Sequence, residues 1–69
     1  MKDEIHLQYW SAQLYPRLFP IIMMGNHADV IEVYKYLKPL PSDDRIVALL
    51  NQLCIDRLAR YGIDHHYIL

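Results

Sequence analysis

The clearest pattern of apolar and polar residues lies in the second half of the chain and predicts a helix over residues 43–61. Ser42 is suited to cap its start, because a serine hydroxyl accepts hydrogen bonds from backbone N–H groups that lack a partner in the first turn. Asp43 and Asp44 then place negative charge at the positive end of the helix dipole. Gly62 follows the helix, and glycine readily takes the left-handed conformation that ends many helices.

The apolar positions of this helix cover more than half of its circumference. A helix that is apolar on most sides needs several neighbours to bury it. Residues 43–61 are therefore predicted to form the central helix of a bundle. The apolar positions are Ile46, Val47, Leu49, Leu50, Leu53, Cys54, Leu58 and Tyr61, with Ile55 on the opposite side.

A second helix is predicted over residues 27–38 from a single apolar stripe. Asn26 and Asp29 have the spacing of a capping box, although Glu or Gln is preferred at the second position. Pro39 and Pro41 end the helix, because proline has no N–H to donate. The short linker predicts that this helix and the next form an antiparallel hairpin or cross steeply. The stripe consists of Val30, Val33, Tyr34 and Leu37.

The first helix, predicted over residues 4–15, carries two apolar stripes. An amphipathic surface helix has one stripe, so two stripes require two neighbours. One neighbour is the protein's own core, and the other is a second contact, within the chain or with another molecule. The pattern does not decide which stripe faces inward. One stripe consists of Leu7, Trp10, Leu14 and Leu18, and the other of Ile5, Tyr9 and Ala12.

Residues 16–25 are predicted to form a proline-kinked connector after the first helix. Pro16 fits the first turn of a new helix or kinks the preceding one, and Pro20 kinks or ends the next turn. Two interpretations of the apolar residues 18–24 remain open. They form a buried connector, or they form an exposed patch for a partner, because large exposed apolar patches are uncommon unless they have a function.

These patterns predict an all-α fold in one domain spanning residues 1–69. It is a small bundle of three main helices, residues 4–15, 27–38 and 43–61, with the kinked connector after the first helix. The C-terminal tail, residues 63–69, is predicted to dock on the bundle because it contains apolar side chains. The predicted core consists of Leu7, Trp10, Leu14, Leu18, Val30, Val33, Tyr34, Leu37, Ile46, Leu49, Leu50, Leu53 and Cys54.

The composition permits a folded core but a small one. The chain has 69 residues, is 54% hydrophobic and carries a net charge of −1. A domain of this size buries only about 60% of its unfolded surface, and the single cysteine, Cys54, cannot form an internal disulfide. We therefore expect the domain to be stabilised by association with a second chain, most simply as a homodimer. No signal-peptide pattern or run of about 20 apolar residues is present, so a cytoplasmic location without membrane contact is expected.

No group of residues points to catalysis, a cofactor or a metal. The chain has two glycines and no glycine-rich phosphate loop, and nothing in the sequence orients Ser11 and His6 as a nucleophile and its base. His65 and His66 follow Asp64, but adjacent side chains of an extended segment point in opposite directions and do not easily share one ion. We therefore expect no enzymatic activity, no cofactor and no metal.

One alternative function is a helix-turn-helix-like DNA-binding regulator that reads DNA with residues 43–61. The first turn of that helix would hold Asp43 and Asp44, which repel phosphate where recognition helices contact DNA. The chain also lacks the basic surplus that drives nucleic-acid binding. DNA binding is therefore the less favoured function.

The favoured function is a non-catalytic protein–protein interaction module that docks on a larger protein or on itself. By analogy with small regulators or inhibitors encoded by phages or plasmids, the module would regulate or inhibit the protein on which it docks. Arg57 falls within the apolar arc of its helix. Three interpretations remain open: its side chain reaches water at the helix end, it pairs with a buried carboxylate, or it binds a partner protein. Arg17 is the only charged residue between Glu4 and Asp29. The candidate partner-binding residues are Ile5, Tyr9, Arg17, Phe19, Ile22, Met23, Tyr36 and Arg57.

Overall fold

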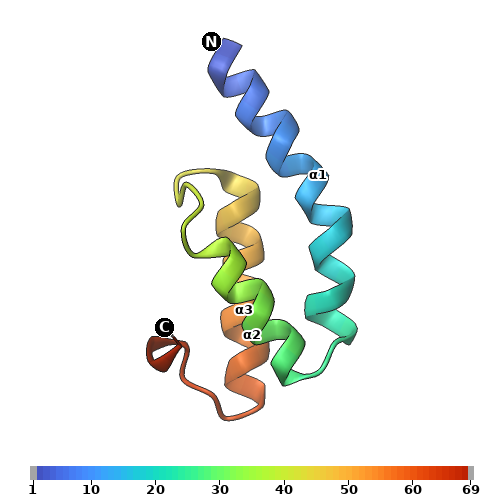
Figure 1. Cartoon of the computed structure of the whole chain (residues 1–69), viewed down its shortest axis with the longest axis vertical. Coiled ribbons are helices and arrows are strands. Elements are labelled where there is room, and N and C mark those ends of the chain that lie inside the picture. The colour runs from blue at the N-terminus through green and yellow to red at the C-terminus, as the bar shows by residue number, and fades with distance from the viewer. Residues whose placement is uncertain (1, 69) are drawn as a thin grey trace.

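The computed structural model describes residues 2–68, and the side chains of residues 11–68. Three α-helices follow one another along the chain, α1 (Lys2–Met24), α2 (His27–Leu37) and α3 (Arg45–Arg60). A short 3-10 turn, η1 (His65–Tyr67), follows α3. Each α-helix packs against the other two, and η1 packs against α3 (Figure 1). The predicted all-α bundle is confirmed.

Helix α1 is longer than predicted, because the expected connector forms its second half. The helix runs without interruption from Lys2 to Met24 and contains Pro16 and Pro20. Proline tolerates helical φ but has no N–H to donate, so each ring costs the helix one backbone hydrogen bond. Burial of apolar residues on one side of this half offsets that cost. A kink at the prolines stays a prediction.

The link between α1 and α2 is tight, and its polar contacts match the predicted capping box. The Asp29 N–H donates to Asn26 Oδ1 at 3.0 Å, and the Asn26 N–H donates to Asp29 Oδ2 at 3.3 Å. Gly25 precedes the cap, where an added Cβ would collide with the carbonyl oxygen of Ile21 and lie 2.9 Å from the Asp29 Cβ. Only glycine fits this turn without displacing its neighbours.

The predicted cap at the start of α3 is wrong by two residues. Asp44, not Ser42, caps the helix: its Oδ1 accepts hydrogen bonds from the N–H groups of Ile46 at 2.9 Å and Val47 at 3.1 Å. Residues 41–44 form a turn in which the Asp44 N–H donates to the Pro41 carbonyl at 3.3 Å. Ser, Asp and Asn are similarly good caps. The choice among three consecutive candidates therefore depends on this turn, which composition does not reveal.

The end of α3 is as predicted. Gly62 has a φ of 77°, in the left-handed region. Its N–H donates to the Ala59 carbonyl at 3.0 Å, and the Ile63 N–H donates to the Leu58 carbonyl at 2.9 Å. This pair of bonds is the Schellman motif. Leu58 is fully buried and Ile63 packs against the core, which adds the apolar contact that commonly accompanies the motif.

The core lies where the three α-helices meet, and it confirms the α2 stripe but not the predicted face of α3. The buried residues of α3 are Val47, Leu50, Cys54 and Leu58. Leu49, predicted to be in the core, is 45% exposed, while Leu53 is partly buried. The α3 face is therefore rotated relative to the predicted one, because apolar residues on most sides of a helix do not define a single inward direction. The remaining buried apolar residues are Leu14, Ile22, Val30, Val33, Tyr34, Leu37 and Ile68; Leu18 and Ile46 are partly buried, and Leu7 and Trp10 lie outside the described side chains.

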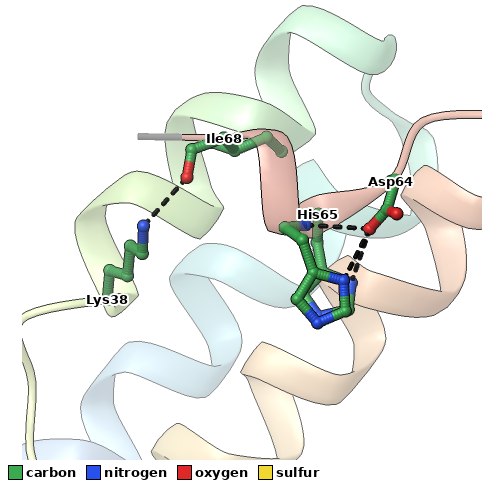
Figure 2. A network of polar contacts seen from close by, with 5 residues as sticks. Lys38, Asp64, His65 and Ile68 are labelled. Carbon is green, nitrogen blue, oxygen red and sulfur yellow. Dashed lines mark hydrogen bonds and ion pairs between the residues drawn. The ribbon is translucent and has the colours of Figure 1, made fainter.

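The C-terminal tail docks on the bundle as predicted. Ile68 is buried, and its carbonyl accepts a hydrogen bond from Lys38 Nζ at 2.8 Å (Figure 2). The ring of His65 lies edge-on to that of Tyr34, with centroids 5.9 Å apart. The tail therefore connects the end of the chain to α2 as well as to α3.

The molecule is elongated, with extents of 41 × 22 × 14 Å. Figure 1 shows the reason: the N-terminal part of α1 extends along the long axis past the ends of α2 and α3. We call residues 2–10 of this helix the arm. Within residues 2–68, no helix combines the length and the hydropathy that a membrane span requires.

Candidate interaction surface

The side of α1 that faces away from the core carries a continuous set of apolar residues. In a helix with 3.6 residues per turn, positions spaced by three or four share one side. Met23 is 40% exposed, Phe19 is partly buried, and the other members are exposed. We call this set the outer strip; it consists of Ala12, Pro16, Phe19, Pro20 and Met23.

The outer strip is uncharged and partly ordered by its own contacts. The ring of Phe19 stacks on that of Tyr15, with centroids 5.0 Å apart and planes 17° apart. Arg17 is exposed beside the strip and is the only charged residue in α1 after Glu4. Two further apolar side chains, Ile21 at 41% and Met24 at 87% exposure, lie outside the core on the same helix. The second half of α1 therefore presents apolar surface on several sides.

The predicted partner-binding residues separate into accessible and inaccessible ones. Arg17, Met23 and Tyr36 are exposed, and Tyr36 belongs to α2 rather than to the strip. Ile22 is fully buried in the core, so its assignment to a partner-binding surface is wrong. The reason is register: once α1 continues through Pro16, Ile22 falls on the same side as the buried Leu14.

Two predicted residues, Ile5 and Tyr9, lie outside the described side chains. Their backbone belongs to α1, and positions 5 and 9 have the helical register of the outer strip. The strip residues that the sequence prediction missed are Pro16 and Pro20. The sequence contained a signal for both prolines. Repeated steps of three or four residues from Ile5 and Tyr9 lead through Ala12 to Pro16 and Pro20.

The structure places Arg57 at the edge of the core without the predicted carboxylate partner among the described side chains. It is partly buried, and its guanidinium carbon lies 5.9 Å from the ring centroid of Tyr61, one turn later. Its Nε is buried and has no hydrogen-bond partner. Among the side chains of residues 11–68, the ion pairs involve Asp64 with His65 and His66, so the predicted Arg57–carboxylate pair is not found there. A buried unpaired donor is costly.

Tyr61 connects the end of α3 to the link between α1 and α2. Its hydroxyl donates to the Gly25 carbonyl at 3.3 Å, and its ring lies edge-on to that of His27 at 5.9 Å between centroids. Tyr61 is 43% exposed and was predicted to lie on the apolar face of α3. It serves as a bridge at the edge of the bundle rather than as a core residue.

The side chains of Asp64, His65 and His66 lie close together, although an extended backbone would have pointed adjacent side chains in opposite directions. Residues 65–67 form the turn η1 rather than an extended segment, so the two rings lie side by side at 4.1 Å between centroids. The His66 Nδ1 is 2.8 Å and the His65 Nδ1 3.9 Å from Asp64 Oδ1 (Figure 2). One ligand atom from each residue lies within 4.8 Å of the other two. These are the residues of this region that offer ligand atoms to a divalent metal.

The Asp64 carboxylate is already engaged by its own turn. It accepts hydrogen bonds from the backbone N–H of His66 at 2.9 Å and from its Nδ1–H at 2.8 Å. The backbone bond, followed by the ring, lowers the pKa of Asp64 from its usual value. A carboxylate at the start of a turn stabilises free N–H groups in the same way as a helix cap. The cluster thus has a sufficient structural role as an N-terminal cap for η1.

A cleft of about 280 Å³ lies between the end of α2 and the first turns of α3. Asn51 Oδ1 is buried near it without a hydrogen-bond partner. Lys38, which also lines the cleft, already donates to the tail. The cleft is lined by Leu37, Lys38, Leu40, Ser42, Val47, Ala48, Asn51 and Gln52.

Two side chains with nucleophilic atoms, those of Cys54 and Ser11, are buried. Cys54 is fully buried, and burial raises the pKa of its thiol to about 12. A thiol with this pKa is protonated at neutral pH, and the thiolate is the reactive form. Ser11 is 1% exposed. Neither side chain is accessible to a substrate in this fold.

No protein-family model, curated protein or solved structure matches the chain at a significant level. Its function therefore has to be argued from its own surface.

Proposed function

We propose that the protein is a non-catalytic protein–protein interaction module that binds its partner through the outer strip of α1. The observation that carries this proposal is the apolar character of α1 on the side opposite the core. Small monomers rarely expose contiguous apolar surface without a use for it. Aromatic residues and Met are also enriched at the centres of protein interfaces, and Phe19 and Met23 are of these types.

The geometry of the strip supports docking of a second protein surface. The strip is convex and lies on a helix, so it fits a groove or a flat apolar face. Stacking of Tyr15 on Phe19 restricts both rings before binding, which lowers the entropy lost when the surface is covered. Met23 is flexible and adapts to a partner of imperfect shape.

A regulator or inhibitor is the role that this module would serve. Its means of action would be to cover a surface of a larger protein, because the accessible face offers shape and apolar area rather than chemistry. We place this activity in the cytoplasm, as expected from the sequence. The step from interaction to inhibition is by analogy with other small helical proteins.

The test compares two exposed apolar residues on different helices. Met23 on the outer strip is 40% exposed and Leu49 on α3 is 45% exposed, so Asp at either position disturbs the core to a similar extent. Immobilised wild type, Met23→Asp and Leu49→Asp would be exposed to lysate and the retained proteins identified by mass spectrometry. We expect one species to be retained by wild type and Leu49→Asp and lost with Met23→Asp.

Equal retention by all three proteins would overturn the outer strip as the binding surface. Circular dichroism of the variants provides the control for folding. A retained species would then be purified and its Kd measured by titration, with Met23→Asp again as the negative control.

DNA binding remains the competing function, and the cap of α3 weighs against it. The first-turn N–H groups of Ile46 and Val47 already donate to Asp44 Oδ1, and the Asp43 side chain is exposed beside them. Recognition helices use this end to approach base edges and phosphates. Titration with a DNA duplex at low salt tests the alternative: salt-sensitive binding that survives Met23→Asp would favour it over the interaction module.

A further inference from the structure

Two imidazole rings and one carboxylate converge at the C-terminal turn. The Nδ1 atoms of His66 and His65 both face the same oxygen, Asp64 Oδ1, at 2.8 Å and 3.9 Å (Figure 2). One ligand atom from each of the three side chains lies within 4.8 Å of the other two. Among the side chains of residues 11–68, this is the group in which three His, Cys, Asp or Glu residues come together in this way.

The cap of η1 accounts for the carboxylate but not for the two rings. The backbone N–H of His66 donates to Asp64 Oδ1 at 2.9 Å, and this bond closes the turn without either imidazole. The rings nevertheless lie side by side, with centroids 4.1 Å and planes 34° apart. Two nitrogen ligands are thereby brought to one side of the carboxylate. An ion shared by the three side chains explains this arrangement.

We propose that Asp64, His65 and His66 form a binding site for a divalent transition-metal ion such as Zn²⁺, held by the two Nδ1 atoms and the carboxylate. Ligand atoms about 2.1 Å from zinc lie roughly 3.4 Å apart in a tetrahedron. The two distances from Asp64 Oδ1, 2.8 Å and 3.9 Å, lie on either side of this value, so small rotations of the side chains suffice.

The types of ligand select the class of ion. Imidazole nitrogen suits zinc, copper, nickel and iron, whereas Mg²⁺ and Ca²⁺ prefer sites built from oxygen alone. Each ring binds as a neutral imidazole that keeps its proton on Nε2, so the proton of His66 Nδ1 is transferred to Nε2 by way of solvent when the ion takes its place. Asp64 supplies the negative charge of the site.

The turn holds the ligands in position before an ion arrives. The Tyr67 N–H donates to the Asp64 carbonyl at 3.1 Å, which fixes the backbone between them. The His65 side chain is 26% exposed, and its ring lies edge-on to that of Tyr34. Asp64 and His66 are exposed, so an ion reaches the site without opening the fold. Such preorganisation lowers the entropy lost on binding.

The ion would reinforce the attachment of the tail. It would join the first residues of η1 to one another, while Lys38 and the buried Ile68 already connect the same tail to α2. Three protein ligands leave at least one coordination position for water. The earlier expectation of no metal assumed an extended backbone at residues 64–66, and η1 replaces that backbone with a turn.

The first experiment is calorimetric titration of the full chain with ZnCl₂ in a buffer that does not bind zinc. We expect one ion per chain. Asp64→Asn keeps an oxygen for the cap but loses the charged ligand, and His66→Ala removes one nitrogen. Each should raise the Kd by at least about tenfold, because loss of even an outer partner of a metal ligand costs 10–100-fold. His27→Ala is the matched control: it removes an exposed histidine outside the cluster and should leave the Kd unchanged.

The second experiment observes the ring nitrogens by NMR. Zn²⁺ should shift the Nδ1 resonances of His65 and His66 and leave those of His27 in place, and Mg²⁺ at the same concentration should shift none of them. Cys54 does not compete for the ion, because its thiol is fully buried and its pKa is raised to about 12.

The third experiment measures the Tm with and without zinc. An ion that binds the folded chain better than the unfolded one stabilises it by mass action. At a zinc concentration about 100 times the Kd, the Tm of the wild type should rise by at least about 5 °C. His66→Ala at the same concentration should show about half of this rise or less, and His27→Ala should show all of it.

Three outcomes would overturn the site. They are the absence of zinc binding by the wild type, equal affinity in the wild type, Asp64→Asn and His66→Ala, and binding without any rise in the Tm. Circular dichroism shows whether each variant is folded. The η1 turn lies on the opposite side of α2 and α3 from α1 (Figure 1). The zinc site and the outer strip therefore stand or fall separately.

Discussion

Helices α1 and α3 have similar apolar content but different surroundings. Helix α3 packs against α1, α2 and η1, and its ends are closed by Asp44 and by Gly62. Helix α1 packs against α2 and α3, and its arm extends past both (Figure 1). The apolar residues of a helix set how much surface it has to bury. The number of other helices that pack against it decides how much of that surface is buried.

The largest predicted effect distinguishes the inner and outer sides of α1. Ile22 is fully buried and Met23 is 40% exposed, although they are adjacent. Ile22→Ala should lower the free energy of unfolding by about 2–5 kcal/mol through lost burial and a cavity. Met23→Ala should change it by less than about 0.5 kcal/mol. Urea denaturation of both variants provides the measurement, and equal losses would contradict the described register of α1.

The next effect concerns the closed link at the end of α1. Gly25→Ala would place a methyl group against the Ile21 carbonyl and the Asp29 Cβ, so we expect a loss of about 1–3 kcal/mol from overpacking. Gly62→Ala, at the end of α3, meets no atom within 4 Å but has to keep a φ of 77°. Its cost should be about 1–2 kcal/mol, from the left-handed conformation alone.

The two glycine variants are distinguished by a second substitution. Replacing Asp29 by Ala in the Gly25→Ala background removes the Asp29 carboxylate but keeps the clash with the Ile21 carbonyl, so stability should recover in part at most. No substitution of a neighbour should rescue Gly62→Ala. Thermal melts of the four proteins would show the contrast, and a neutral Gly25→Ala would mean that the link is open.

A smaller effect tests the corrected start of α3. Asp44→Ala should cost about 1 kcal/mol, because it removes the acceptor for the N–H groups of Ile46 and Val47. Ser42→Ala should be close to neutral, since Ser42 is exposed and precedes the cap within the turn of residues 41–44. Chemical denaturation measures both. A larger loss of stability for Ser42→Ala than for Asp44→Ala would mean that Ser42 caps the helix, as the sequence predicted.

These comparisons also show which parts of the fold could be predicted from the sequence. The capping box of Asn26 and Asp29 and the ending at Gly62 were predicted, because each depends on residues within one or two turns of each other. The continuation of α1 through Pro16 was not, because it depends on the burial of Ile22 by other helices. The inward face of α3 was also missed, since Leu49 and Leu50 are equally apolar and only the packed neighbours distinguish them.

The candidate surface follows the same division. Of the candidate partner-binding residues, Met23 and Tyr36 are exposed, and their role in binding stays a prediction. Ile22 is buried, because the helix continues through Pro16 and its register turns Ile22 toward the core. The proximity of His65 and His66 was missed for a related reason: a single 3-10 turn brings together side chains that an extended backbone separates. Short-range signals indicate where helices end, and long-range packing decides which residues remain exposed.

The smallest effect concerns the tail, which covers one side of α2 and α3. Hydrogen bonds from His66 lower the pKa of Asp64, so the folded chain holds this carboxylate ionised more strongly than the unfolded chain does. The resulting stabilisation of η1 is present above the usual pKa of aspartate and is lost as the pH falls through the lowered value. The expected contribution is small because Asp64 is exposed. An NMR titration of the Asp64 carboxyl carbon should give a midpoint below that of a free aspartate.

His66→Ala sharpens this titration, because it removes the ring but keeps the backbone N–H, which is the larger cause of the lowered pKa. The midpoint should therefore move only part of the way back toward the ordinary value. A complete return would mean that the His66 ring alone holds the carboxylate and that η1 is not closed by its backbone bond. No change would mean that the ring makes no contact with Asp64 in solution, and the tail would then depend on Ile68 and Lys38 for its attachment to the bundle.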